Sequence, residues 1–304
     1  MYEQIAANKR KTVFLVALFV LLLSAVGLAV DYLLQGGLIG FVVVAVIVAV
    51  ASFVSYFNSD KVALRMAHAV PADPVQYARF HNLVEGLCIA SGLPKPRLYI
   101  VDDSAPNAFS TGRNPKHAAV AVTTGLLEKM NRVELEGVLA HELSHIRNHD
   151  VLVMTLAVPM VGIIALISDF VLRIMFWTGV TGGRDDNNNQ SNNPLGFVFA
   201  IFGFVLLIFA PIIAKLMQFA VSRNREYLAD ASGVQLTRYP PGLISALEKL
   251  KGDHTSTHFA SKATAHLWIE SPLDEDSGGT VSKFNHLFDT HPPLEERIRV
   301  LKAM

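Results

Sequence analysis

The chain has 304 residues and equal numbers of acidic and basic side chains, 26 of each, so its formal net charge at pH 7 is zero. Hydrophobic residues make up 51% of the sequence, charged residues only 17%, and the mean hydropathy is +0.37. This composition is typical of membrane proteins. The charge balance argues against nucleic acid as a partner, and the single cysteine, Cys88, excludes an internal disulfide.

Four stretches of the sequence carry no charged side chain and approach or exceed the length needed to cross the roughly 30 Å hydrocarbon core of a bilayer. They are Thr12–Val30, Tyr32–Ser59, Val151–Ser168 and Leu195–Ala214. We therefore expect the lipid bilayer to be a partner. The third stretch is the shortest and contains a proline, so the sequence leaves open whether residues 151–220 span the bilayer fully or only dip into it.

The charges around the first stretch predict the orientation of the chain. Lys9–Lys11 precede it, whereas the turn after it carries only Asp31. Because basic residues remain on the cytoplasmic side, we expect the N-terminus and residues 60–150 in the cytoplasm and the loop 184–194 outside. A cleaved signal peptide over residues 9–30 is the alternative, but the long apolar core and the immediate second stretch favour an uncleaved anchor.

The next elements in the chain belong to a small α+β unit. Asp73–Ser91 has helical periodicity and is followed by Gly92 and Pro94, which end helices. Short strands are predicted over Arg97–Val101 and Ala118–Val122.

Asn107, Ala108 and Phe109 lie between these two strands and form a candidate third strand. An edge strand at this place could pair with the backbone of an extended substrate, without selecting its side chains. These three residues are therefore candidates for substrate binding. The alternative is that Asn107 caps a turn after Pro106.

The most informative motif, HELSH, occupies residues 141–145 of a predicted helix. Asn131 is the expected N-cap, Glu134 completes a capping box, and the helix is expected to continue to His149. His141 and His145 are one turn apart and therefore share a face, so both imidazoles can reach one Zn²⁺.

Glu142 follows the first histidine of this motif, so its side chain points about 100° away from that of His141. It is expected to reach the water on the zinc rather than the zinc itself. Zinc lowers the pKa of this water to about 7, so that a carboxylate can take its proton at neutral pH and pass it to the leaving amine. Glu142 is therefore the candidate general base for peptide hydrolysis.

A catalytic zinc also needs a third protein ligand. Glu226 and Asp230 are spaced by four residues in the segment SRNREYLAD and share one helix face. Glu226 can bind the metal, while Asp230 can accept a hydrogen bond from a ligand imidazole and fix its tautomer. An ordinary charged helix end is the alternative for this segment taken alone.

Two further helices are expected near the C-terminus, over Pro240–Lys251 and Pro292–Met304. His291 immediately precedes the second of them. It is either a helix-entry residue exposed to water or a donor that stabilises the oxyanion of the tetrahedral intermediate, with Arg297 in support. We interpret His149 as a non-ligand, although it continues the face of the HELSH helix.

Four motifs in this order resemble the M48 peptidases, and most closely their bacterial heat-shock membrane proteases, over nearly the whole chain. In chain order, the motifs are the segment Pro106–Gly112, HELSH, SRNREYLAD and the segment Thr290–Ile298. The resemblance implies a zinc endopeptidase of the gluzincin type that uses one Zn²⁺ per chain. Its ligands would be His141, His145 and Glu226, and its base Glu142.

The resemblance also implies roles for three residues outside the metal site. Asn107 would lie on the edge strand beside the substrate, and His291 and Arg297 would approach the scissile carbonyl. The implied function is quality control, in which misfolded or damaged membrane proteins are cleaved at the cytoplasmic face of the cell (inner) membrane.

We therefore predict a mainly α-helical multi-pass membrane protein with four hydrophobic helices and a cytoplasmic α+β zincin domain that carries a small β-sheet. Residues 1–60 form the first transmembrane hairpin and 151–220 the second. The catalytic domain is assembled from residues 61–150 and 221–304. Its other partners are polypeptide substrates, and the sequence does not predict an oligomeric state.

Two other functions are compatible with these motifs. One is a processing peptidase like the type I prenyl-protein (CAAX) protease, although this chain is shorter and has fewer hydrophobic stretches. The other is a non-hydrolytic membrane scaffold or chaperone in which zinc only joins the two cytoplasmic halves. Structural zinc sites usually have four protein ligands, whereas three are predicted here.

Overall fold

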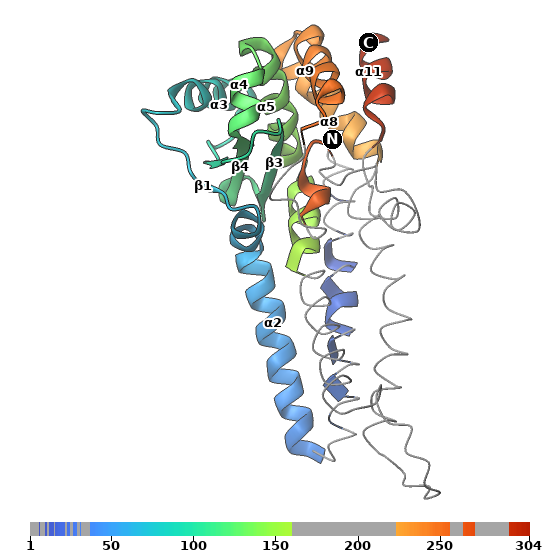
Figure 1. Cartoon of the computed structure of the whole chain (residues 1–304). Helices are drawn as coiled ribbons and strands as arrows, with labels where there is room; N and C mark the ends of the chain where they lie inside the picture. Colours follow the sequence, from blue (N-terminus) through green and yellow to red (C-terminus); the bar gives the residue numbers. More distant parts are fainter. Residues whose placement is uncertain are drawn as a thin grey trace, which may run out of the picture.

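In the computed structural model of the chain, the described residues are 37–159, 223–255, 264–270 and 292–304, together with scattered positions between 6 and 31. Figure 1 shows a folded unit of helices and a small sheet, with the long helix α2 (Gly37–Met66) projecting from one end of it. This unit contains the HELSH helix.

The sheet in this part of the chain has four strands in the order β1-β2-β4-β3. The strands are β1 (Val70–Pro71), β2 (Arg97–Val101), β4 (Ala118–Thr123) and β3 (Ala108–Gly112). β2 and β4 are parallel, whereas β1 and β3 run antiparallel to their neighbours. The two predicted strands are thus confirmed, and the candidate third strand forms β3 at the edge of the sheet.

In the described part of the chain, six α-helices besides α2 and the short helix Asp150–Pro159 accompany the sheet, and two of them begin at a side-chain cap, Thr123 and Asn131. The six are α3 (Ala78–Ser91), α4 (Thr124–Lys129), α5 (Arg132–Arg147), α8 (Arg223–Thr237), α9 (Pro240–Gly252) and α11 (Leu294–Lys302). The capping box predicted for the HELSH helix is present: Asn131 accepts from the N–H of Glu134, and the Glu134 carboxylate accepts from the N–H of Asn131.

Two helix boundaries differ from the prediction because local bonds compete with the helix. Asp73 was expected to begin α3, but its carboxylate accepts from the N–H groups of Val75 and Gln76 and holds a turn before the helix. The HELSH helix ends at Arg147 rather than His149, since His149 has a left-handed φ of 57°.

The two faces of the sheet bury different apolar clusters, as the twofold alternation of strands requires. One face, with Leu98, Ile100 and Val120, packs against α3, α5, α9 and α11. The other face, with Val101 and Phe109, packs against the end of α2, the helix Asp150–Pro159 and the segment around Trp268. The sheet is therefore covered on both sides, and β4 is buried throughout.

Glycines allow α5 to lie close to two later helices. A Cβ built on Gly137 would stand 2.7 Å from the backbone nitrogen of Leu243 in α9, and one on Gly242 would stand 2.6 Å from the carbonyl oxygen of Val133. A Cβ on Gly233 of α8 would lie 3.0 Å from the backbone nitrogen of His141. The backbone of the HELSH helix is thus in direct contact with α8 and α9.

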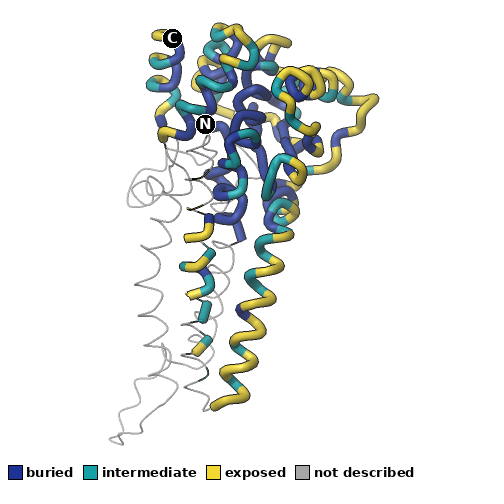
Figure 2. Tube along the Cα trace, turned by 180° about the vertical axis from the view of Figure 1, so that it is seen from behind, coloured by how far each residue is buried: buried dark blue, intermediate teal, exposed yellow. Residues whose placement is uncertain are grey.

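Among the described residues, α2 is the one helix long and apolar enough to cross a membrane, with a mean hydropathy of 2.9 over its most apolar window. Its apolar side chains are largely exposed, as the yellow tube in Figure 2 shows, and Leu38 is 80% exposed. It overlaps the second stretch expected to span the bilayer, Tyr32–Ser59, over residues 37–59 and continues to Met66. The other three stretches lie wholly or partly outside the described residues, as does the loop 184–194.

The helix crossing at Gly137 can be tested by measuring stability. We expect Gly137→Ala to destabilise the protein by about 1–3 kcal/mol, because its methyl group must push the α9 backbone away. Gly86→Ala is the matched control. Gly86 lies on the exposed side of α3 with nothing within 4 Å of an added Cβ, so alanine there should stabilise by about 0.5–1 kcal/mol. Equal thermal unfolding of the two variants would contradict this crossing.

Candidate metal centre

The two histidines of HELSH converge inside the protein. His141 and His145 lie one turn apart on α5 and are 1% and 3% exposed. Their Nε2 atoms are 3.2 Å apart, and their rings meet edge to face with centroids 4.7 Å apart. Both Nε2 atoms therefore face the same point, which is the arrangement expected from an i, i+4 pair on one helix.

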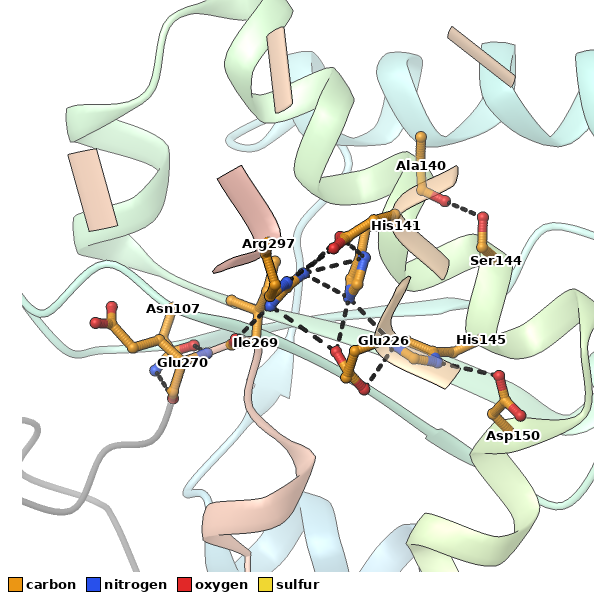
Figure 3. Close-up of polar contacts among 11 residues, drawn as sticks. Asn107, Ala140, His141, Ser144, His145, Asp150, Glu226, Ile269, Glu270 and Arg297 are labelled. Carbon is orange, nitrogen blue, oxygen red and sulfur yellow. Dashed lines mark hydrogen bonds and ion pairs between the residues drawn. The ribbon is translucent and has the colours of Figure 1, made fainter. Parts of the chain in front are cut away.

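Glu226 brings the third donor to this point from α8. Its Oε2 lies 3.5 Å from Nε2 of His141, and its Oε1 lies 3.6 Å from Nε2 of His145. In a tetrahedral site with ligand bonds of about 2.0–2.2 Å, neighbouring donor atoms are about 3.3–3.6 Å apart. The two nitrogens and the carboxylate thus have the spacing and chemistry of a three-ligand metal site, and Figure 3 shows them converging.

The imidazole of His141 is fixed by contacts with Asp230 and Arg297. Its Nδ1 lies 2.9 Å from Oδ1 of Asp230, so a proton on Nδ1 directs the lone pair of Nε2 toward the metal site. The Arg297 guanidinium donates to both Asp230 oxygens at 2.6 and 2.9 Å and to the carbonyl oxygen of Ile269 at 3.1 Å. Asp230 therefore sits between an imidazole and a fully buried guanidinium.

These neighbours shift two pKa values in the metal-free site. Burial and the charge of Arg297 both oppose protonation of His141, but hydrogen bonds to Asp230 and Glu226 outweigh them and raise the pKa of His141 to about 9. Burial alone would raise the pKa of Asp230, but the charge of Arg297 and the hydrogen bonds from His141 and Arg297 lower it to about 2. Asp230 is therefore ionised at neutral pH.

The imidazole of His145 also has a carboxylate at its Nδ1 atom, from Asp150, which the sequence did not indicate. Nδ1 of His145 lies 3.3 Å from Oδ2 of Asp150, which is completely buried. On a continuous helix Asp150 would point about 140° away from His145. The left-handed conformation of His149 interrupts the helix before Asp150, and Asp150 contacts the imidazole instead. A left-handed residue of this kind gives no signal in hydrophobic periodicity.

Glu142 lies between the two histidines on α5 and is 2% exposed. Its negative charge acts on Arg297: burial lowers the pKa of this guanidinium, but the charges of Asp230, Glu226 and Glu142 more than offset that and raise it. The predicted base is therefore in the same buried cluster as the three donors.

The edge strand β3 lies beside this cluster, but its edge is partly occupied. The carbonyl oxygen of Ala108 accepts from the N–H of Ile269 at 2.9 Å, and Phe109 forms an antiparallel bridge with Trp268. At the other end, the N–H of Gly112 donates to Oγ1 of Thr155. By alternation, the N–H and C=O of Ser110 point toward the same edge between these contacts.

Asn107 joins the edge strand to the same segment. Its side-chain amide donates to the carbonyl oxygen of Glu270 at 2.9 Å, and its Oδ1 accepts from the N–H of Ala108 at 3.0 Å. Asn107 is thus a buried residue that ties the start of β3 to residues 269–270, near Arg297 (Figure 3). His291 lies outside the described residues.

Most of the chain matches a known protein family: residues 74–304 match the model of peptidase family M48. The chain belongs to this family. Proteins called protease HtpX homolog are similar over the full length: that of Caldanaerobacter subterraneus is 44% identical over 304 residues, covering 100% of this chain and 98% of its own, and that of Streptococcus uberis is 44% identical over 305 residues, covering 100% of both.

Among solved structures, the crystal structure of S. mikatae Ste24p matches with a TM-score of 0.49 and 16% identity, covering 99% of this chain and 67% of that one. The family match confirms the resemblance that the four sequence motifs indicated. This M48 peptidase is a metalloendopeptidase, and His141, His145 and Glu226 form a buried group that can hold its metal ion.

The raised pKa of His141 predicts how metal binding depends on pH. At pH 7 the metal-free imidazole holds a proton that the metal must displace, so the affinity should rise with pH until about 9 and then level off. Chelator competition between pH 6.5 and 9 measures this. Asp230→Asn removes a charge that raises this pKa, so its affinity should level off at lower pH. Affinity independent of pH in the unaltered chain would contradict the protonated state of His141.

Proposed function

We propose that the chain is a zinc-dependent endopeptidase of the cell membrane that cleaves misfolded or damaged membrane proteins at the cytoplasmic face. The observation that carries this proposal is the convergence of two imidazole nitrogens and one carboxylate, all buried, at tetrahedral spacing. A site with two nitrogen ligands, one oxygen ligand and a fourth position for water is typical of catalytic zinc.

The chain's own residues supply the remaining chemistry. A bound zinc would supply Lewis acidity that makes water a nucleophile at neutral pH. Glu142, held on the helix α5 next to the first ligand, would take a proton from the attacking water and pass it to the leaving amine. Its burial keeps bulk water away from the proton transfer and strengthens the electrostatic interactions inside the site.

The edge of β3 is the proposed place for the substrate backbone. The C=O of Ser110 faces this edge between the contacts of Ile269 and Thr155, and Asn107 ties the start of the strand to residue 270. Pairing through the backbone needs no particular side chain and supports broad specificity. A role of Arg297 and His291 at the scissile carbonyl belongs to the same proposal.

The membrane location rests on α2 and on the charge pattern of the sequence. α2 ends at Met66 and leads directly into the sheet, so a bilayer around it would keep the metal centre on one side. The names of the relatives support the protease function over a prenyl-protein peptidase or a scaffold. A scaffold would also have no use for a buried carboxylate beside the metal ligands.

The base assignment is tested with Glu142→Gln in the full-length protein. The amide has the same size but cannot accept the proton, so we expect proteolysis of an unfolded membrane-protein substrate to fall by at least about 10²-fold. Metal content should be unchanged, since Glu142 is not a ligand. Glu136→Gln, on the partly exposed side of the same helix, is the control and should retain activity. Full activity of Glu142→Gln would refute the assignment.

The orientation is tested with two cysteine variants and a membrane-impermeant thiol reagent. The natural Cys88 is only 4% exposed and should react slowly. We expect Asn82→Cys, on the exposed side of α3, to react only after the cells are permeabilised, because this helix is cytoplasmic in our proposal. Asn189→Cys in the outer loop should react in intact cells. The reverse pattern would place the metal centre outside.

A further inference from the structure

The metal centre contains two parallel arrangements, only one of which was anticipated from the sequence. Nδ1 of His141 faces Asp230, and the arginine that neutralises Asp230 comes from a different element, α11. Nδ1 of His145 faces Asp150. Each imidazole thus has a buried carboxylate at its Nδ1 atom.

We propose that Asp150 is a positioning residue for His145. The inference rests on the proposed metal site and extends it to a residue that no motif assigned. Asp150 would keep the Nδ1 proton of His145 in place, so that the lone pair of Nε2 points at the metal. It would also restrict rotation of the ring.

Burial makes an uncompensated charge at Asp150 unfavourable. Asp150 is 0% exposed, so bulk water does not compensate its charge. A donor group must stabilise the carboxylate instead, and Nδ1 of His145 lies 3.3 Å from its Oδ2. The contact therefore serves both side chains: the imidazole is oriented, and the buried carboxylate gains a donor.

A purely structural role for Asp150 is the competing explanation. Asp150 begins the helix Asp150–Pro159, where a negative charge or a capping oxygen is favourable. Serine caps helices as well as aspartate does, but its side chain is too short to reach an imidazole that Asp150 contacts at 3.3 Å. Asparagine has the shape of aspartate and lacks its charge. The variants Asp150→Ser and Asp150→Asn therefore separate the two roles.

The experiment measures the Zn²⁺ affinity of the full-length protein in detergent by chelator competition, together with thermal unfolding of the metal-free protein. If Asp150 orients His145, both variants should bind Zn²⁺ about 10- to 100-fold more weakly, which is the usual effect of losing a residue behind a metal ligand. Glu136→Gln, on α5 away from the site, is the control for a general loss of negative charge and should bind as the unaltered chain does.

A spectroscopic measurement locates the effect at His145. In the Co²⁺-substituted protein each ligand imidazole gives one exchangeable Nδ1–H resonance shifted by the metal. Asp150→Asn should move or broaden one of the two, and Asp230→Asn the other. Unchanged Zn²⁺ affinity and an unchanged spectrum in Asp150→Asn, with a lower unfolding temperature, would overturn the inference and leave the proposed function intact. Failure of the unaltered chain to bind Zn²⁺ would overturn both.

Discussion

The structure depends on keeping a cluster of buried charges neutral around the two imidazoles. Four carboxylates lie there, Glu142, Asp150, Glu226 and Asp230, together with the guanidiniums of Arg225 and Arg297. At their formal charges the two arginines compensate two carboxylates and leave two negative charges. Isolated buried charges are strongly unfavourable. A divalent cation held by His141, His145 and Glu226 would provide the missing charge, and a proton on His141 provides part of it when no metal is bound.

This balance explains why the centre is assembled from separate stretches of chain. One helix cannot place three donors, two orienting carboxylates and two arginines around a single point. α5 provides the imidazoles and Glu142, α8 provides Arg225, Glu226 and Asp230, and α11 adds Arg297. The approach is possible because Gly233 lets the α8 backbone come within contact of His141. Packing and charge compensation are therefore parts of the same constraint.

The sequence predicted those features that depend on neighbouring residues. The capping box at Asn131, the strands β2 and β4, and the shared face of His141 and His145 all follow from spacing within one element. Glu226 followed from chemistry, because a catalytic zinc needs another ligand and an acidic pair stood at helical spacing. Arg297 was reached only through family resemblance. Its contact with Asp230 joins residues that are 67 positions apart, and no local pattern encodes such a pair.

Asp150 and Ile269 show two reasons why the rest could not be predicted. Asp150 reaches His145 through a left-handed residue that is not glycine, so the expected helix gave it the wrong direction. The prediction of a free edge on β3 was incomplete for another reason: the N–H of Ile269 comes from a segment more than 150 residues later in the chain and takes the carbonyl oxygen of Ala108. Strand edges are completed by whatever chain arrives there, which spacing cannot reveal.

The occupied edge has a consequence for the kind of substrate that the proposed protease can use. With Ala108 and Gly112 engaged by Ile269 and Thr155, and Phe109 bridged to Trp268, little of the β3 edge is left for backbone pairing unless those contacts are exchanged. A substrate segment can pair there only if its own N–H and C=O groups are unbonded. In folded proteins nearly all of these groups are already paired, and in a membrane helix they are satisfied within the helix. Recognition through the backbone at a nearly closed edge therefore selects chains that have lost their fold, and a damaged membrane protein meets this requirement without any sequence motif.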